Sequence, residues 1–231
     1  MAKGKLIGVG VGPSDPEMMT LKAVRVIREN PVIAFPGKSA GESTAYGIAV
    51  RAVPEMAEKE LVPLDFPMVT DEEKLEKVRK KNAAVLESIM DEGKNVVFLT
   101  LGDPSVYSTF SGLNRIAAAD GYLTEMISGV PSFCAAAAAL GISLADGKDT
   151  IRVIPASSEV SWDPGEGGTT VLMKSGRRFA AVREKLQTSG QDVRMVENCG
   201  MPDERKYAGA ENLPEKAGYF SLIIVRSRTD E

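Results

Sequence analysis

The sequence of 231 residues has no histidine and only two cysteines, Cys134 and Cys199. The absence of histidine excludes Ser/His/Asp and Cys/His catalysis, histidine metal sites and histidine acid–base chemistry. Two cysteines without a Cys-x-x-Cys spacing predict neither a disulfide framework nor a zinc or redox motif, and we expect no metal site. Cys134 lies among alanines, which predicts a core position. An enzyme of this composition must use carboxylates, hydroxyls, lysines or a reactive cosubstrate.

Long apolar runs are also missing, since none approaches the roughly 20 residues of a membrane-spanning helix. The first ten residues, MAKGKLIGVG, lead into a strand rather than a signal peptide, so we expect a cytoplasmic protein without membrane contacts. A net charge of -4 gives no positive excess for a nucleic-acid backbone, so nucleic acid is not an expected partner. The hydrophobic fraction of 43% is typical of a folded globular protein.

The first half of the chain alternates strands with helices. Apolar runs at residues 5–11 and 96–101 predict buried strands, and VIAF, which begins at Val32, predicts another. Helical spacing predicts a helix in residues 19–30 and a long one over residues 71–92, with a capping box formed by Thr70 and Glu73. The charged run on the long helix is expected to face solvent. This order predicts βαβ architecture.

The second half has more strands for each helix. Helices are predicted near residues 132–141 and 177–186, and strands near residues 124–128, 150–155, 169–173, 192–197 and 219–225. Because one clear helix separates the later strands, we expect a mixed or antiparallel sheet there. The predicted fold class is α/β, with an N-terminal domain at residues 1–112 and a C-terminal domain at residues 113–231.

The segment TLGDPSVYSTF, residues 100–110, joins a buried strand to a helix. The carboxyl end of a strand in an open α/β sheet is where ligands bind. There Gly102 lets backbone groups approach a ligand closely, and Asp103 adds a negative charge. A purely structural interpretation stays open, with Asp103 as a helix N-cap and Pro104 at the first helical position.

A second glycine-rich segment, GVGVGPSDPE, begins at Gly8. Glycines between a strand and a helix can hold a phosphate group, but here Gly8, Gly10 and Gly12 have G-x-G-x-G spacing and Pro13 follows. A dinucleotide-binding fingerprint places its third glycine one position later, and the acidic residue expected to end the second strand is missing. NAD is therefore a poor candidate. A tight turn without a ligand stays open as the alternative.

These two segments and GVPSFCAAAAALG, residues 129–141, together resemble the tetrapyrrole methylases, which use S-adenosylmethionine. The resemblance covers nearly the whole chain. The segments LDFPMVTD, STF after GDPSVY, and YFSLIIVR further resemble the precorrin-2 C20-methyltransferases, a branch that includes the cobalt-factor II enzymes. One departure is SLADG, residues 143–147, where the branch has a PLA-type sequence.

The resemblance implies two α/β domains with the cosubstrate in the cleft between them. It assigns the methionine and sulfonium end to Gly102, Asp103, Val106 and Tyr107, with Ser132 and Phe133 across the cleft. It assigns the adenosine to Met173, Cys199 and Gly200, with Ser221 as a weaker candidate. Gly10, Gly12 and Pro13 would border the tetrapyrrole cavity. For Met173, a plain position in a strand core stays open.

The implied reaction transfers a methyl group from S-adenosylmethionine to C20 of precorrin-2 or cobalt-factor II in cobalamin biosynthesis, leaving S-adenosylhomocysteine. Tyr107, a carboxylate or water would accept the proton lost from that carbon. The family resemblance also implies a homodimer. Two alternatives stay open: a methylase of the same fold with another acceptor, such as uroporphyrinogen III, another corrin position or a diphthamide precursor, and a non-catalytic nucleotide-binding α/β protein.

Overall fold

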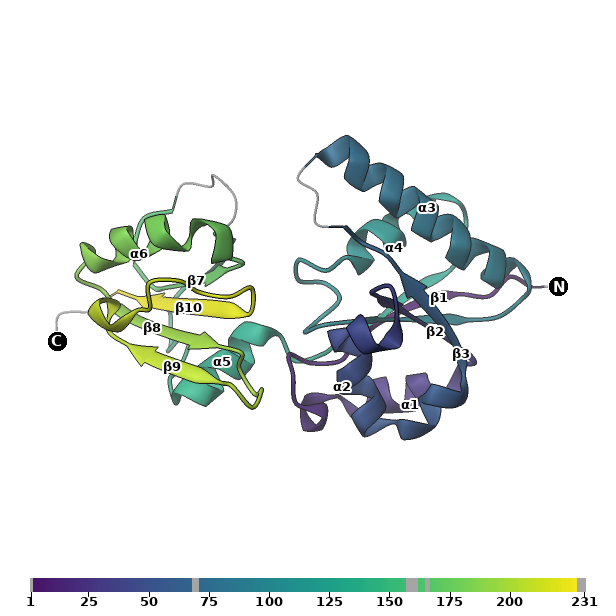
Figure 1. The fold of residues 1–231 in the computed structure, drawn as a ribbon, viewed down its shortest axis with the longest axis horizontal. Coiled ribbons are helices and arrows are strands. Elements are labelled where there is room, and N and C mark those ends of the chain that lie inside the picture. The colour runs from purple at the N-terminus through teal and green to yellow at the C-terminus, as the bar shows by residue number, and fades with distance from the viewer. Residues whose placement is uncertain (1, 68–70, 157–161, 165–166, 228–231) are drawn as a thin grey trace. The chain divides into compact units, whose positions relative to one another are not determined.

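The computed structural model describes residues 2–67, 71–156, 162–164 and 167–227. The chain divides into two compact units, which we call the first unit (Met1–Pro131) and the second unit (Ser132–Glu231) (Figure 1). Each unit contains one five-stranded sheet with helices packed on it. The α/β fold class and the two α/β domains predicted from the sequence are therefore confirmed.

The sheet of the first unit is parallel throughout, with strand order β3-β2-β4-β1-β5. Its strands are β1 (Leu6–Gly10), β2 (Val32–Pro36), β3 (Glu60–Leu64), β4 (Val96–Thr100) and β5 (Thr124–Ile127). Every residue of β1 and β4 is buried, as expected for central parallel strands with both faces covered. The predicted strands at β1, β2 and β4 are confirmed, whereas β3 was not predicted.

Four α-helices cover this sheet, two on each face (Figure 1). They are α1 (Leu21–Glu29), α2 (Thr44–Ala52), α3 (Glu72–Asp91) and α4 (Phe110–Ala119), with short 3-10 turns at Pro16–Met18, Ala40–Glu42 and Pro54–Glu58. Ile7 and Val9 of β1 pack with α1 and α2, while Leu6 packs with α3 and α4. Alternate side chains of a strand thus form two separate cores.

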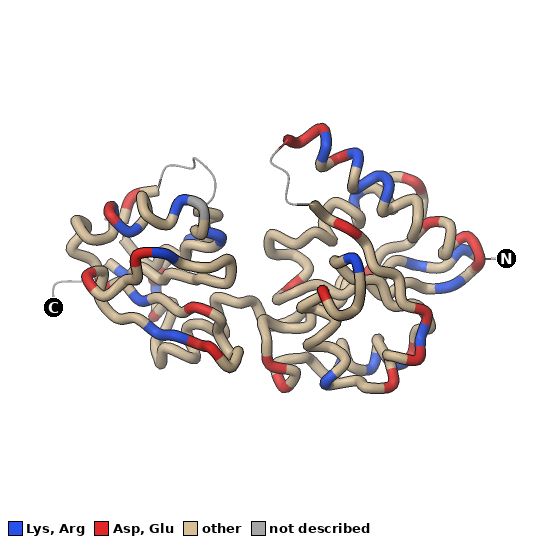
Figure 2. The backbone as a smooth tube through the Cα atoms, viewed as in Figure 1, with Lys and Arg blue, Asp and Glu red and all other residues tan. Residues whose placement is uncertain are grey.

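The long helix α3 was predicted to within one residue at each end. Thr70, predicted to cap it, lies outside the described residues, and Asp71 is the N-cap, accepting hydrogen bonds from Glu73 N and Lys74 N. Acidic and basic residues are interspersed along α3 (Figure 2), which agrees with the predicted solvent-facing charged run. Among the helices of the described residues, none has the length and apolarity to cross a membrane.

The boundary between the units differs from the predicted one. A division after residue 112 would cut α4, whereas the contacts divide the chain after Pro131. The reason is that β5 pairs in parallel with β1, so residues 124–127 complete the first sheet instead of starting the second. The intervening α4 packs on the first sheet through Phe110 and Leu113.

The sheet of the second unit is mixed, in the order β6-β7-β10-β8-β9. Only the β6–β7 pair is parallel among its described pairs, which confirms the expected change of sheet type. Its strands are β6 (Ile151–Pro155), β7 (Thr169–Met173), β8 (Asp192–Glu197), β9 (Arg205–Ala208) and β10 (Ser221–Arg226), of which β9 was missed.

Two α-helices pack on the second sheet, and each covers its own group of core residues. They are α5 (Ser132–Leu140) and α6 (Phe179–Gln187), with 3-10 turns at Gly176–Arg178 and Ala210–Asn212. In α5 the buried residues are Ala135, Ala136 and Ala137, whereas Cys134 is exposed. The predicted core position of Cys134 is therefore wrong, because the helix turns this side chain away from its buried face.

Candidate functional site

Three glycines meet at the carboxyl ends of β1, β4 and β5. A Cβ atom on Gly10 would lie 2.5 Å from Gly102 O and 2.7 Å from Gly129 N, both far inside van der Waals contact. Gly10 and Gly129 therefore allow three backbone segments to pack directly on one another. Glycine is needed at residue 10 because backbone atoms of the same chain occupy the space that a side chain would fill. This supports the alternative in which the glycine-rich segment forms a tight turn.

The two glycine-rich motifs are joined by a pair of backbone hydrogen bonds. Gly102 N donates to Gly12 O at 2.9 Å, and Gly12 N donates to Gly102 O at 3.3 Å. Both residues have left-handed backbones, with φ of +74° at Gly12 and +65° at Gly102, which glycine adopts without strain. The structure thus brings together Gly10, Gly12 and Gly102, with Pro13 half-buried beside them.

Asp103 is 7% exposed, and its carboxylate joins two strand ends. Its Oδ1 accepts hydrogen bonds from Ser105 N (2.8 Å) and Ser105 Oγ (2.5 Å). Its Oδ2 accepts from Gly129 N (3.0 Å) and from Ser128 Oγ. Burial acts to raise the pKa of Asp103, but these hydrogen bonds outweigh burial and lower it below the ordinary value. The group therefore stays negatively charged near neutral pH.

These contacts correct the N-cap interpretation of Asp103. Helix α4 begins at Phe110, so Pro104 is not its first residue. Asp103 instead closes a tight turn, in which Val106 N donates to Asp103 O at 3.2 Å. Asp103 lies in the β4–α4 connection and is tied to the residues that follow β5.

Tyr107 lies in the middle of this connection with a left-handed backbone, φ +46°, and is 44% exposed. This conformation costs a non-glycine residue about 1–2 kcal/mol. Both neighbours of Tyr107 are held: Val106 N donates to Asp103 O, while Ser108 Oγ lies 2.8 Å from Thr100 Oγ1 and accepts from Phe110 N. Strain of this kind is concentrated at ligand-binding and catalytic positions.

In the second unit, the carboxyl ends of β7 and β8 meet the beginning of β10. Met173 pairs with Leu222, and Glu197 pairs with Ser221. Phe133, Met173 and Cys199 all pack against the same group of core residues. The structure therefore gathers three predicted cosubstrate residues around one core of the second unit, with Gly200 next along the chain after Cys199.

Two further left-handed residues follow these strand ends. Lys174, with φ of +58°, follows Met173, and Asn198, with φ of +51°, follows Glu197. Within the described residues, Tyr107, Lys174 and Asn198 are the non-glycine residues with positive φ, and each adjoins a segment predicted to bind the cosubstrate. Asn tolerates this conformation, so Asn198 was detectable from the sequence, whereas nothing in the sequence marks Lys174. Burial lowers the pKa of Lys174.

The two remaining polar candidates of the second unit are both held inside it. Burial, and then the nearby Glu204, raise the pKa of Cys199 to about 11, so this thiol is not a nucleophile at neutral pH. Ser221 is 4% exposed, and its Oγ lies 2.6 Å from Gly218 O and 3.4 Å from Glu197 Oε1. The hydroxyl of Ser221 therefore serves the packing of its own loop.

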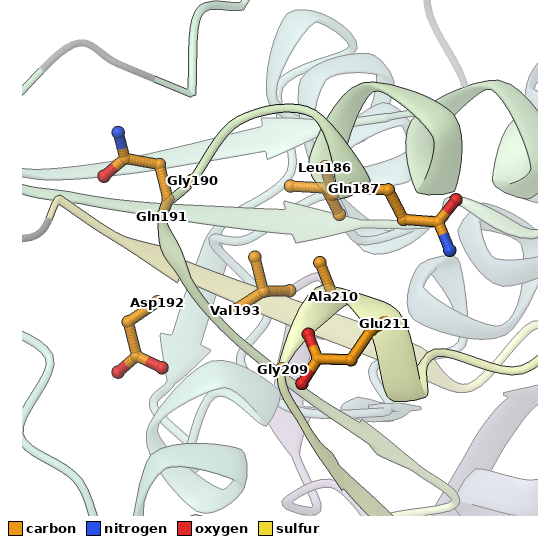
Figure 3. Close-up of a pocket in the computed structure, with 9 residues that line it drawn as sticks. All are labelled: Leu186, Gln187, Gly190, Gln191, Asp192, Val193, Gly209, Ala210 and Glu211. Carbon is orange, nitrogen blue, oxygen red and sulfur yellow. The ribbon is translucent and has the colours of Figure 1, made fainter.

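A cavity of about 170 Å³ opens at the other end of β8 (Figure 3). It lies between the end of α6, the start of β8 and the segment after β9, and Gln187, Asp192 and Glu211 contribute its polar groups. None of the residues predicted for cosubstrate or substrate lines this cavity. The candidate site is therefore defined by the strand ends and not by this cavity.

Comparison with known proteins identifies one matching family, and relatives that align with nearly the whole chain. The sequence model described as Tetrapyrrole (Corrin/Porphyrin) Methylases matches residues 5–213. A Methanocaldococcus jannaschii protein named Probable cobalt-precorrin-2 C(20)-methyltransferase is 32% identical, covering 96% of each chain. A Sinorhizobium protein named Precorrin-2 C(20)-methyltransferase is 29% identical, covering 96% of this chain and 95% of its own.

A solved structure shares the fold. The uroporphyrin-III C-methyl transferase from Thermus thermophilus, complexed with S-adenyl homocysteine, superposes with a TM-score of 0.67 at 22% sequence identity. The superposition covers 96% of this chain and 97% of that one.

Proposed function

The chain belongs to the tetrapyrrole (corrin/porphyrin) methylases, and from this we propose that it transfers a methyl group from S-adenosylmethionine to C20 of precorrin-2 or cobalt-factor II. The observation that carries the proposal is the 32% and 29% identity, over nearly the full chain, to proteins named for methylation at C20. The reaction belongs to cobalamin biosynthesis. Methylation of another acceptor and a non-catalytic role are less favoured by the same similarity.

The composition of the chain fits this chemistry. S-adenosylmethionine supplies a methyl group already activated on a sulfonium, so the protein's main task is to bind and orient two molecules. No histidine is needed for that task, and the sequence has none. We assign the methionine and sulfonium end to Gly102, Asp103, Val106 and Tyr107, with Ser132 and Phe133.

Asp103 has a more specific role in this proposal than the sequence suggested. Its carboxylate accepts four hydrogen bonds from its own chain, so it fixes the shape of the connection that presents Gly102 and Tyr107. Its lowered pKa keeps a negative charge in this region, which favours a cationic cosubstrate. Tyr107 is the candidate acceptor for the proton that leaves C20, with a carboxylate or water as alternatives.

In the second unit we assign the adenosine to Met173, Cys199 and Gly200. Met173 and Cys199 pack against the same group of core residues, and their polarizable side chains suit contact with a flat ring system. Ser221 remains the weaker candidate because its hydroxyl is used within its own loop. Gly10, Gly12 and Pro13 are assigned to the tetrapyrrole. A homodimer is also part of this proposal. In size-exclusion chromatography such a dimer would elute at twice the mass of the chain.

The deciding experiment is an anaerobic reaction with methyl-labelled S-adenosylmethionine and either metal-free precorrin-2 or cobalt-factor II. We expect mass spectrometry and NMR to find one labelled methyl group at C20, and the faster acceptor identifies the natural substrate. Parallel reactions with uroporphyrinogen III serve as the specificity control. A label at another carbon, or faster transfer to uroporphyrinogen III, would contradict the proposed position of methylation.

A further inference from the structure

Glu197, the last residue of β8, binds three groups that come from three different segments. Its Oε2 accepts a hydrogen bond from the hydroxyl of Tyr207 in β9, at 2.9 Å. Its Oε1 accepts from Gly218 N at 3.0 Å and lies 3.4 Å from the Oγ of Ser221, the first residue of β10. One half-buried carboxylate therefore joins β8, β9 and the connection that leads into β10.

The loop that follows Glu197 is closed by its own acidic side chains. Asn198 Nδ2 donates to Asp203 Oδ2 at 2.7 Å, and Gly200 N donates to Glu204 Oε2 at 2.6 Å. Asn198 N also donates to Phe220 O at 3.1 Å, which ties this loop to the segment before β10. The loop that carries Cys199 and Gly200 is thus held by hydrogen bonds to its own acidic side chains and to the segment before β10.

The left-handed backbone of Asn198 shows why an anchor is needed at this point. A residue in this conformation persists only when its surroundings fix it on both sides. Asp203 holds the side chain of Asn198, and the preceding residue, Glu197, is itself fixed by the donors Tyr207 and Gly218 N. Removing the Glu197 carboxylate would leave those donors without their acceptor and release the strained residue.

We infer that Glu197 is a positioning residue for cosubstrate binding: it holds the loop of Cys199 and Gly200, and the segment before Ser221, in the shape that receives the adenosine. This inference rests on the proposed function, which assigns the adenosine to Cys199 and Gly200. Glu197 acts through these loops, because its two oxygens are used by Tyr207, Gly218 and Ser221.

The hydrogen-bond chemistry separates two substitutions at this position. In Glu197→Gln, the amide oxygen can still accept from Gly218 N and Ser221, while the amide NH₂ can donate to the Tyr207 hydroxyl, which is also an acceptor. In Glu197→Ala, the Tyr207 hydroxyl and Gly218 N both lose their acceptor, while the Ser221 hydroxyl keeps Gly218 O. The glutamine variant should therefore preserve most of the loop geometry, and the alanine variant should not.

The test measures binding of S-adenosylhomocysteine to the full chain by calorimetry. We expect Glu197→Ala to weaken binding about tenfold or more, and Glu197→Gln by roughly two- to fivefold. Glu211→Ala is the matched control, because Glu211 is an exposed glutamate of the same unit that lines the cavity at the opposite end of β8. This control should bind S-adenosylhomocysteine as the wild type does.

Steady-state kinetics distinguish positioning from a general loss of structure. In the variants that retain activity, the KM for S-adenosylmethionine should rise while the KM for the tetrapyrrole stays unchanged. Equal increases of both constants, or unchanged binding of S-adenosylhomocysteine by Glu197→Ala, would overturn the inference. If the alanine variant does not fold, Tyr207→Phe removes one donor only. Unchanged binding by both Tyr207→Phe and Glu197→Gln would likewise overturn it.

Failure of the proposed function gives a different result. A wild-type protein that binds S-adenosylhomocysteine but methylates neither precorrin-2 nor cobalt-factor II would contradict the proposed acceptor. The binding measurements on Glu197 would still decide the inference, because they need no tetrapyrrole. A wild-type protein that does not bind S-adenosylhomocysteine would overturn both.

Discussion

The two units fix their strand ends by different means. In the first unit, Gly10 and Gly129 let three backbone segments pack directly, and one carboxylate, Asp103, ties two of them together. In the second unit, side chains fix the strand ends, since Glu197 joins three segments and Glu204 closes the adjoining loop. Direct backbone packing leaves no space for a side chain, whereas a carboxylate can be replaced by an amide of the same shape. The first unit should therefore tolerate change at its strand ends less than the second.

The largest effect is expected from Gly10→Ala. The new Cβ atom would lie 2.5 Å from Gly102 O, and backbone atoms cannot move aside as a flexible side chain can. We expect the free energy of unfolding to fall by about 3 kcal/mol, measured by denaturant titration. The matched control is Gly47→Ala in α2, where a Cβ would meet nothing within 4 Å. There we expect a gain of about 0.5–1 kcal/mol. Equal effects at both glycines would contradict direct backbone packing.

The next largest effect is expected from Asp103→Ala. It leaves the donors of Ser105, Ser128 and Gly129 without an acceptor, and we expect a loss of about 2 kcal/mol at neutral pH. The exposed N-cap Asp71→Ala is the control, with a loss of about 1 kcal/mol.

The effect of Asp103 should depend on pH in a defined direction. Its folded-state pKa lies below the unfolded value, so its stabilising contribution is complete above a pH of about 4. That contribution is lost as the pH falls through the folded-state pKa. Denaturant titrations of the wild type and Asp103→Ala should therefore give a difference that shrinks in acid. A difference that grows in acid would show that the carboxylate is not stabilised by these hydrogen bonds.

The smallest effects concern the left-handed residues, which occur in both units. Lys174→Gly should stabilise the protein by about 1 kcal/mol, because glycine adopts a φ of +58° without strain. Asn198→Gly should give less, since asparagine tolerates this backbone better than lysine does. Thermal unfolding of both variants measures the difference. A loss of stability in Lys174→Gly would mean that the contacts of the lysine side chain outweigh the relief of strain.

Most of the fold was predictable from periodicity, and the misses have a common cause. The buried runs of β1 and β4 and the apolar spacing of α3 are strong local signals. Strands β3 and β9 lie at sheet edges, where exposed residues weaken the alternation of apolar and polar side chains. The predicted boundary between the units was misplaced because β5 pairs with β1, a strand far away in the sequence, and local patterns do not reveal such pairing. Periodicity also cannot orient a helix made mostly of alanine, so the exposure of Cys134 was missed.

The candidate site was predictable as a set of segments but not as a set of contacts. Glycine spacing led to Gly12 and Gly102, and the structure joins them by two hydrogen bonds across 90 positions of the chain. The donors to Asp103 from Ser128 and Gly129 could not be foreseen, because they come from the end of another strand. Glu197 carries no local signal, since its donors from Tyr207 and Gly218 are brought to it only by the folded sheet.

The two thiols of the chain differ in a way that has practical value. Burial raises the pKa of both thiols, to about 11 for Cys199, but Cys134 is the exposed one, on α5. A maleimide reagent should therefore attach to Cys134 faster than to Cys199. The natural sequence thus provides a preferred attachment point for a fluorophore or spin label on the second unit. A second cysteine introduced on α3 would complete a label pair for measuring, by energy transfer or electron resonance, how the distance between the units responds to a methyl donor.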